Sequence, residues 1–445
     1  MTRSLACLAL RFPSLAALVV LVALLAGGLW LAPGEAVART FDIVENHDVD
    51  FDFSTRRGLR LRFREPDLSF RVGGRLHLDG LVAGEDEVPI DSPDGDLRRA
   101  RLYLAGEALD LVRFKVDREF APDRKGWRNV WIGFRLPKRT QIKVGNFVAP
   151  FGLEDPAASN YSTFLERAVS SAIAPSFQTG VLVHSSGRFG RSRSRQRWTA
   201  AAAFTSEPLG QASDDRHGTE HLGFASRVTW APLAKKRRVV HFGASFEYRD
   251  LRGDNGYRIT SRPEVGIITY PLRTGSLANV DSVVSYGLDS IGLFGSLTLQ
   301  GEFMQSFVQR NGRDDPSFLG GYVQASYVLT GERRRYSRSQ GVLLGVKPRS
   351  AWGAVELGVR ASTLDLQDAG VDGGRTRDLT VGLNWYIREN VRLMFNYVAV
   401  DAEVAATGRT DRPHIGLARF MVFFWRHGRR PMHGLERGGT IGRAR

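Results

Sequence analysis

The sequence predicts an all-β protein, a transmembrane antiparallel β-barrel of 16 strands. In most segments after residue 65, apolar and polar residues alternate with a period of two, which is typical of strands with one apolar and one polar face. These segments are about ten residues long, the length that a tilted strand needs to cross a bilayer. The chain of 445 residues also begins with an export signal, and its mean hydropathy of -0.22 suits a barrel with a polar interior.

A large soluble β-sandwich, propeller or solenoid is the alternative fold. The absence of a fixed internal repeat argues against propellers and solenoids. The polar face of the segments is rich in charged residues and glycine, which suits a water-filled lumen better than the crowded interior of a small closed barrel. A 16-stranded barrel leaves about 25 residues for each strand and its loop, a comfortable spacing for a barrel with a channel.

The N-terminus has the features of a secretory signal peptide over residues 1–38. Arg3 and Arg11 precede a long apolar run, and the small residues of Ala36-Val37-Ala38 follow it, so we expect cleavage after Ala38. An uncleaved membrane anchor is the alternative, because the apolar run is long for a signal. Cleavage removes Cys7, the one cysteine, and changes the net charge from +15 to +14. The exported chain is then held together without disulfides.

The strands are recognised by the residues that share a face. In residues 111–117, for example, two valines and a phenylalanine oppose Arg113, Lys115 and Asp117. Between two of the segments, Arg388-Glu389-Asn390 is expected to form a tight hairpin turn. The clearest segments are 68–84, 111–117, 129–136, 296–307, 378–390 and 391–398.

Residues 58–425 are predicted to form the barrel, and segments of different composition flank it. Residues 39–57 are acidic and form an N-terminal leader or an irregular first segment. The last predicted strand is rich in aromatic residues and ends at Phe424-Trp425. Residues 426–445 carry six arginines and five glycines, which predicts a flexible basic C-terminal tail.

The stretch after Val144 departs from the strand pattern. Pro150 and Gly152 end a strand, and a polar, mixed sequence continues until alternation returns near Gly180. Long connections inside compact domains are uncommon and are usually functional. The stretch is therefore a candidate functional loop.

Arginine and lysine dominate the polar face of the predicted strands. Guanidinium groups keep their charge at any relevant pH and form paired hydrogen bonds with oxyanions, so a row of them along a pore would attract anions and pass them from site to site. The alternative is that each arginine forms a structural ion pair with a neighbouring strand, and acids that could serve are present on the same face (Asp79, Asp117, Glu247, Glu302 and Glu356). The candidate anion pathway consists of Arg71, Arg75, Arg99, Arg101, Arg113, Lys115, Arg135, Lys143, Arg227, Arg249, Arg360, Arg388 and Arg392.

Further basic clusters fall in predicted loops and turns, at residues 191–197, 235–238 and 331–339. They are candidates for binding lipopolysaccharide phosphates or for drawing anions towards the pore. An exported chain is not expected to bind nucleic acid. We find no motif for phosphate-binding loops, metal ligands or cofactors, so we expect no enzyme and no cofactor. His184-Ser185-Ser186 and His241 are the one hint of a serine hydrolase, and a histidine on a strand is usually structural.

Several blocks resemble the phosphate-selective porin O and P family of Gram-negative outer membranes. They lie in family order over most of the chain, and the most specific contains Pro150-Phe151 and Leu153-Glu154, followed by Phe164-Leu165-Glu166-Arg167. Others, such as the strand with Arg98-Arg99, add to the match. The matching blocks are residues 70–80, 94–110, 130–167, 262–275, 286–303 and 320–336.

The resemblance implies a 16-stranded, usually trimeric barrel that conducts anions across the outer membrane of a Gram-negative bacterium. Phosphate or polyphosphate is the leading substrate, through an arginine-lined lumen. The loop at about Phe151 to Ala174 resembles the segment that folds into the lumen and narrows it, with a helix-like stretch from Ser162 to Ser171. An outer-membrane barrel with a structural or surface-interaction role and little conduction is the alternative. The polar candidates of this constriction loop are Glu154, Asp155, Tyr161, Glu166 and Arg167.

Overall fold

The computed structural model describes residues 49–54, 58–63, 67–85, 95–190, 195–209, 221–254, 256–265, 272–404 and 409–424. The predicted signal peptide and basic tail lie outside these residues, as does most of the acidic leader. By its internal contacts the chain divides into Met1–Phe41 and Asp42–Arg445, and all the elements below belong to the second part.

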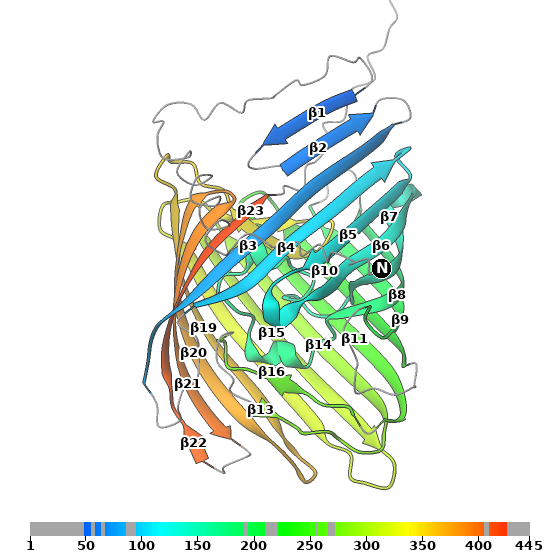
Figure 1. The fold of residues 1–445 in the computed structure, drawn as a ribbon, viewed down its shortest axis with the longest axis vertical. Coiled ribbons are helices and arrows are strands. Elements are labelled where there is room, and N and C mark those ends of the chain that lie inside the picture. The colour runs from blue at the N-terminus through cyan, green and yellow to red at the C-terminus, as the bar shows by residue number, and fades with distance from the viewer. Residues whose placement is uncertain are drawn as a thin grey trace, which may run out of the picture. The chain divides into compact units, whose positions relative to one another are not determined.

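A closed ring of 16 antiparallel strands forms the body of the protein (Figure 1). Each strand pairs with the next, and β23 pairs with β3 from His414 opposite Glu85 to Phe424 opposite Gly74, which closes the ring. The predicted 16-stranded barrel is therefore confirmed. Its strands are β3 (Leu68–Glu85), β4 (Gly95–Ala108), β5 (Val112–Glu119), β6 (Gly126–Leu136), β7 (Thr140–Val148), β8 (Phe177–Arg188), β9 (Arg197–Ser206), β10 (Leu222–Ala234), β11 (Arg238–Asp254), β14 (Val280–Phe294), β15 (Leu297–Arg310), β16 (Ser317–Val328), β19 (Ala354–Asp368), β20 (Val371–Arg388), β21 (Val391–Val404) and β23 (His414–Phe424).

Three further strands extend the sheet outside the ring. β1 (Val49–Ser54) and β2 (Gly58–Phe63) form a hairpin, and β2 pairs with the first residues of β3 (Figure 1). β22 (Arg409–Asp411) pairs with the end of β21. The region expected to be a leader or an irregular first segment thus contributes a regular strand, β1.

The two ends of the ring have different connections. We call the end where β4 joins β5 the turn end, because its connections are short apart from residues 329–353. At the opposite end, the loop end, residues 149–176 and 255–279 form the longest connections. β3 begins and β23 finishes at the turn end. Among the described residues, no helix is long and apolar enough to cross a membrane.

Short elements lie within these connections. The long ones contain the strand pairs β12 (Thr260–Ser261) with β13 (Leu272–Arg273) and β17 (Arg334–Ser337) with β18 (Val342–Val346). Within the part of the chain that the structure describes, the short helical turns are η1 (Pro122–Arg124), η2 (Pro137–Arg139), η3 (Ser159–Tyr161) and η4 (Val169–Ala172).

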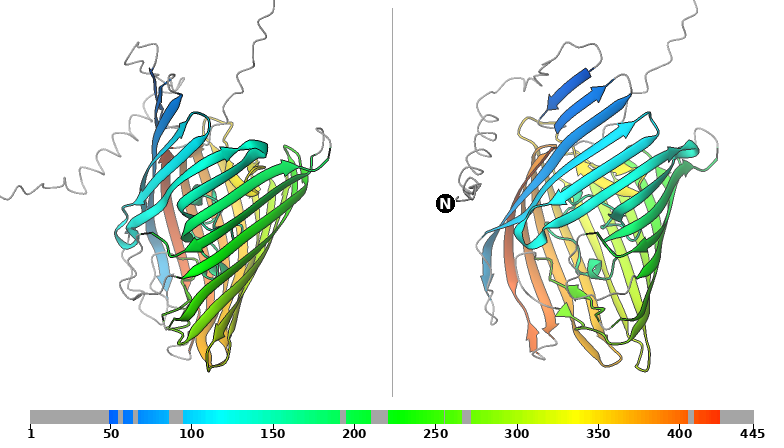
Figure 2. Two further views of the ribbon diagram at one scale, coloured as in Figure 1. Left: turned by 90° about the vertical axis from the view of Figure 1, so that its right-hand side faces the viewer. Right: turned by 45° about the vertical axis from the view of Figure 1, so that its right-hand side comes forward.

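Large apolar side chains cover the outer face of the ring. Phe204 is 72% exposed and Leu288 is 60% exposed, and similar residues recur on every second position of neighbouring strands. Exposed apolar surface of this extent marks contact with a partner or a membrane, and an apolar outer band is characteristic of transmembrane barrels. The strands run obliquely around the ring (Figure 2), as closure of a sheet into a barrel requires.

The hydrophobic core lies inside the ring, between the wall and the long connections. Phe151, Val169 and Ile173 from residues 149–176 pack with Ile259 and Leu272 from the next long connection. Wall residues of β11, β14, β15, β16, β19 and β20 complete this cluster. A second cluster packs Leu165 and Val265 against β21 and β23, and a third packs Leu153 with Val342 and Leu343. The long connections therefore belong to the packed interior.

Candidate functional site

Residues 149–176, between β7 and β8, lie inside the barrel. Their contacts reach strands on opposite sides of the ring, such as β3 and β11, and a single segment can do this only from the interior. Wall residues that hydrogen-bond to the segment include Arg75 on β3, Arg98 on β4, Ser245 on β11, Glu302 on β15, Arg360 on β19, Asn384 on β20, Arg392 on β21 and Arg419 on β23.

The start of this segment depends on a glycine. Gly152 has a φ of +65°, and its N–H donates to Ser245 Oγ at 3.0 Å while the next N–H, of Leu153, donates to Glu302 Oε1 at 2.6 Å. A Cβ at position 152 would lie 2.5 Å from the same Glu302 oxygen. Residue 152 must therefore be glycine for the chain to turn inward this closely to β15.

Glu166 is the main ionic anchor of the segment. Its carboxylate accepts hydrogen bonds from Arg98 Nε at 2.6 Å and from Arg419 Nη2 at 2.7 Å. Burial alone would raise the pKa of Glu166, but the Arg98 and Arg419 guanidinium groups hold this pKa well below its ordinary value. Glu166 is therefore ionised over the whole neutral and mildly acidic range.

The other four loop candidates also make contacts that hold the segment together. Glu154 accepts a hydrogen bond from the Ala168 N–H at 2.9 Å, and Asp155 forms an ion pair with Arg167. The Tyr161 ring packs edge-on against Phe423, with 6.1 Å between the ring centroids.

The pKa values of Glu154 and Asp155 are shifted in the opposite direction from that of Glu166. Burial raises the pKa of Glu154, with partial opposition from Arg360, and burial likewise raises the pKa of Asp155 against the opposing charge of Arg167. These two carboxyl groups take up protons more readily than Glu166 as the pH falls.

The prediction of a helix-like stretch from Ser162 to Ser171 is wrong. The segment contains only the short turns η3 and η4. Wall arginines use the carbonyl groups that a helix would need, because Arg392 donates to the carbonyls of Ser162 and Thr163 and Arg360 donates to that of Glu166. Bonds to the wall replace bonds within the segment.

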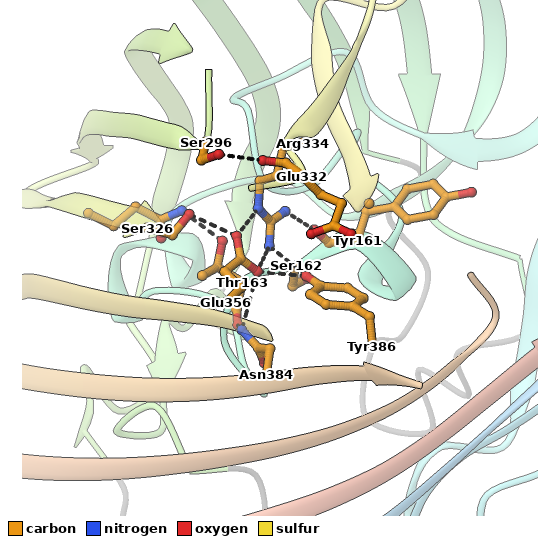
Figure 3. A network of polar contacts seen from close by, with 12 residues as sticks. Tyr161, Ser162, Thr163, Ser296, Ser326, Glu332, Arg334, Glu356, Asn384 and Tyr386 are labelled. Carbon is orange, nitrogen blue, oxygen red and sulfur yellow. Dashed lines mark hydrogen bonds and ion pairs between the residues drawn. The ribbon is translucent and has the colours of Figure 1, made fainter. Parts of the chain in front are cut away.

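A second internal segment, residues 329–353, enters from the turn end. Arg334 on β17 forms a two-bond ion pair with Glu356 on β19, at 2.6 and 2.9 Å, and donates to the Tyr161 carbonyl at 2.6 Å (Figure 3). Tyr386 Oη donates to the same carboxylate at 2.6 Å, and Asn384 links it to Thr163. One buried network thus joins both internal segments to the wall.

A third internal segment, residues 256–265, is anchored through Glu264. Its carboxylate accepts hydrogen bonds from Arg360 Nε at 2.8 Å and from the hydroxyls of Ser362 and Thr380 at 2.5 Å each. Arg360 also lies over the Phe164 ring at 4.5 Å. This predicted pathway arginine therefore joins two internal segments to β19.

Most predicted pathway cations on β10 to β21 have structural partners. Arg227 forms a bidentate ion pair with Asp289, at 2.9 and 3.0 Å, and Arg249 forms an ion pair with Glu247 at 3.0 Å. Arg392 donates to two carbonyls of residues 149–176. On this side of the barrel the ion-pair alternative describes the arginines better than an open ladder of charges does.

The cations on β3 to β7 have a different environment. Arg99 on β4, Arg113 on β5 and Lys143 on β7 are half-buried and have no hydrogen-bond or ion-pair partner among the described residues. Lys143 lies over the Trp131 ring at 4.8 Å. Arg75 donates only to Ser159 Oγ, at 2.8 Å, and its Nε has no partner in the described part of the chain.

Two other candidates on this wall do have acidic partners. Arg101 pairs with Glu119 at 2.9 Å, and Lys115 pairs with Asp117 at 2.9 Å. The wall formed by β3 to β7 therefore carries more cations than acids to pair with them.

Three predicted pathway residues lie near the turn end of the barrel. Arg135 is exposed and pairs with Glu107 at 2.5 Å, and Arg388 donates to the Ala351 carbonyl at 2.6 Å. Arg71 is half-buried on the part of β3 that pairs with β2. These positions lie towards the rim, away from the contacts of residues 149–176.

Four arginines that contact the interior segments or the nearby wall are absent from the predicted anion pathway, although Arg98 belongs to a block that matched the family: Arg98, Arg128, Arg334 and Arg419. Arg98 lies where the pairing of β3 and β4 shifts register between His77 and Asp79, so alternation does not assign its face. Arg334 lies in a connection without periodicity. Arg419 shares the inward face of β23 with Leu417 and Met421, and because this face is otherwise apolar, alternation of polar and apolar residues does not identify it.

Two known proteins are similar to this chain in sequence over most of its length. Porin O of Pseudomonas aeruginosa is 25% identical over 419 residues, covering 83% of this chain and 91% of the relative. An uncharacterized protein of Caulobacter vibrioides is 26% identical over 377 residues, covering 79% of this chain and 73% of the relative.

Among solved structures, the anion-selective porin of Comamonas acidovorans matches with 12% identity and a TM-score of 0.47, over 80% of this chain and 100% of its own. The trimer form of OmpT from Vibrio cholerae matches with 11% identity and a TM-score of 0.48, over 80% of this chain and 99% of its own. The family model for phosphate-selective porin O and P matches residues 70–424. The chain therefore belongs to the phosphate-selective porin O and P family.

Proposed function

We propose that this protein is a porin for the passive diffusion of small anions across the outer membrane, with phosphate or polyphosphate as the leading substrate. The single observation that carries this proposal is the set of cations without acidic partners on one wall. Arg99, Arg113 and Lys143 have no such partner among the described residues, whereas the arginines across the barrel are engaged.

The anion path would run along β3 to β7. Buried arginines in two-bond ion pairs are already neutralised, so they add little attraction for a mobile anion. Half-buried cations at the edge of the interior can exchange their water for an anion without breaking an existing pair. Arg75 and Arg99 lie on neighbouring strands, with Arg101 and Arg113 further along the same wall.

Residues 149–176 would set the width of this path. The segment is held across the interior by contacts with β11 and β15 on one side and with β20, β21, β23 and Arg75 of β3 on the other. Its acids are committed to Arg98, Arg419, Arg167 and backbone groups. The segment therefore narrows the passage while adding little free negative charge to it.

The zero-current potential in a planar bilayer under a KCl gradient tests the proposal. The wild-type protein should be anion-selective, and added phosphate should reduce its chloride current. Replacing Arg99, Arg113 and Lys143 together by glutamine should abolish most of the anion selectivity. The control replaces three cations of the outer face, Arg118, Arg375 and Arg377, and should leave the potential unchanged. Cation selectivity of the wild type would refute the proposal.

A barrel with a structural or surface-interaction role and little conduction is the second candidate. It is favoured by the three internal segments, whose apolar side chains pack into clusters between the segments and the wall. Absence of conductance from protein that is folded and inserted would support it over the porin. A homotrimer is part of the porin proposal, and chemical cross-linking in membranes tests it independently of conductance.

A further inference from the structure

Three consecutive short connections at the turn end are strongly basic. Lys138 and Arg139 lie between β6 and β7, and the connection between β8 and β9 is flanked by Arg188 and Arg197. Lys235, Lys236, Arg237 and Arg238 lie at the turn between β10 and β11. Since these strands are neighbours in the ring, the cations form one continuous sector of the rim, the basic rim: Lys138, Arg139, Arg188, Arg195, Arg197, Lys235, Lys236, Arg237 and Arg238.

The basic rim has no acids of its own. The sequence contains no aspartate or glutamate in residues 137–139, 188–197 or 235–238. Like charges lie close together in it, since Arg197 is near enough to Arg139, Arg188 and Arg338 to interact with them electrostatically. Nearly all of them are exposed. A concentration of like charge at the surface is unfavourable for the protein alone and favours an external anionic partner.

Aromatic side chains lie on the outer face directly beside this rim. Trp230 is 46% exposed and its ring lies 6.4 Å from that of Phe242, while Phe189 lies 6.3 Å from Trp198. Phe294, at the end of β14, continues the row. Tryptophan and other aromatic residues collect at the level of lipid headgroups in membrane proteins. The row therefore places the neighbouring cations at the depth of the lipid phosphates.

The orientation of the barrel in the membrane determines which lipids the basic rim can contact. In outer-membrane barrels the short turns face the periplasm, and here both ends of the chain's barrel region lie at that same end. The leaflet on that side contains phospholipids. Lipopolysaccharide, which the sequence suggested for the basic clusters, belongs to the leaflet at the loop end, so the turn-end clusters are not placed to bind it.

We propose that the basic rim docks the headgroups of anionic phospholipids in the periplasmic leaflet. Lys235, Lys236 and Arg237 form its most concentrated point, above Trp230 and Phe242. Clusters of four to eight basic residues beside a membrane-spanning element are typical of anionic lipid recognition. The lipid chains would cover the aromatic row while the headgroup phosphate meets the turn.

Quenching of tryptophan fluorescence by brominated lipids tests this docking. Full-length protein is reconstituted in vesicles that mix phosphatidylcholine with phosphatidylglycerol, and each lipid is brominated in turn. The wild type should bind phosphatidylglycerol several-fold better than phosphatidylcholine next to its tryptophans. Lys235→Gln/Lys236→Gln/Arg237→Gln should bring this ratio close to one. The matched control, Arg258→Gln/Arg273→Gln/Arg313→Gln, removes three exposed cations from the loop end and should keep the wild-type ratio.

The salt dependence of the lipid preference and the zero-current potential of the variant complete the test. Raising the NaCl concentration should reduce the preference of the wild type without any mutation, because exposed charges are screened. An equal affinity of the wild type for the two lipids, or a preference unchanged in the turn variant, would refute the docking. A variant that shifts the zero-current potential but keeps the lipid preference would also refute it and assign the rim to the pore mouth.

Discussion

Arg334 and Glu356 form an ion pair that is almost fully buried inside the barrel, joined by two hydrogen bonds of 2.6 and 2.9 Å. The pair connects the internal hairpin of β17 and β18 to the wall strand β19. Because Arg334 also donates to the Tyr161 carbonyl, the pair fixes two internal segments at once.

Replacing Arg334 by alanine should strongly destabilise the protein. Removal of one partner leaves Glu356 buried without a counter-charge, at a cost of about 3–5 kcal/mol. The free energy of unfolding in urea measures this effect, and the single-channel conductance should rise because the hairpin is released. Arg335→Gln is the control, since its ion pair with Glu389 is partly exposed and contributes at most about 1 kcal/mol. Equal stability of the two variants would contradict the anchoring role of Arg334.

Anion selectivity should increase when the pH is lowered from neutral. The pKa values of Glu154 and Asp155 are raised, so these groups gain protons above the ordinary carboxyl range, and the interior loses negative charge. Glu166 has a lowered pKa, so its stabilising contribution is present above the unfolded pKa and is lost only as the pH falls through the lower folded value. Zero-current potentials at several pH values measure the effect. In the Glu154→Gln/Asp155→Asn variant, the anion selectivity should change little with pH.

Gly152→Ala should destabilise the inward turn more than an alanine at a comparable glycine elsewhere. Gly312 has a similar φ of +67° but nothing within 4 Å of an added Cβ, whereas the Cβ at position 152 would collide with Glu302. Both variants carry the strain of a left-handed residue, about 1–2 kcal/mol. The difference in their unfolding free energies therefore isolates the contact with Glu302. Equal unfolding free energies of the two variants would mean that the turn accommodates the added Cβ without a loss of stability.

Leu288→Arg should cost about 2–4 kcal/mol, because this side chain lies on the outer face in the middle of β14. Phe294→Arg, at the end of the same strand, should cost only about 0–1 kcal/mol, since an arginine there reaches the headgroup region. Unfolding from lipid vesicles measures both variants. Equal costs would contradict the assignment of the outer band to the hydrocarbon.

The sequence was sufficient to predict the wall of the barrel, because strand alternation is a local property. The turn between β20 and β21 lies at Glu389-Asn390, as expected, and the acids Asp117 and Glu356 face inward with the cations. Alternation assigns a residue to a face but does not identify its partner. Arg227 and Arg99 are both predicted to be inward-facing cations. Among the described residues, however, only Arg227 forms an ion pair with a carboxylate.

The internal segments were harder to predict, because their conformation depends on contacts distant in sequence. Glu264 reaches Arg360, 96 residues away, and Arg334 reaches the Tyr161 carbonyl, 173 residues away. No sequence pattern in residues 256–265 or 329–353 indicates that these residues are partners. The expected helix after Ser162 failed for the same reason, since wall arginines bind the carbonyl groups that would have formed it.

The seam between β3 and β23 gives residues 149–176 a consequence for assembly. Asp79 and Arg419 meet across the seam although 340 residues separate them, so the sheet keeps two open edges until the last strand arrives. Glu166 then binds Arg98 on one side of the seam and Arg419 on the other. Residues 149–176 thus also bridge the seam from β4 to β23, and this contact can form only once the last strand has joined the sheet.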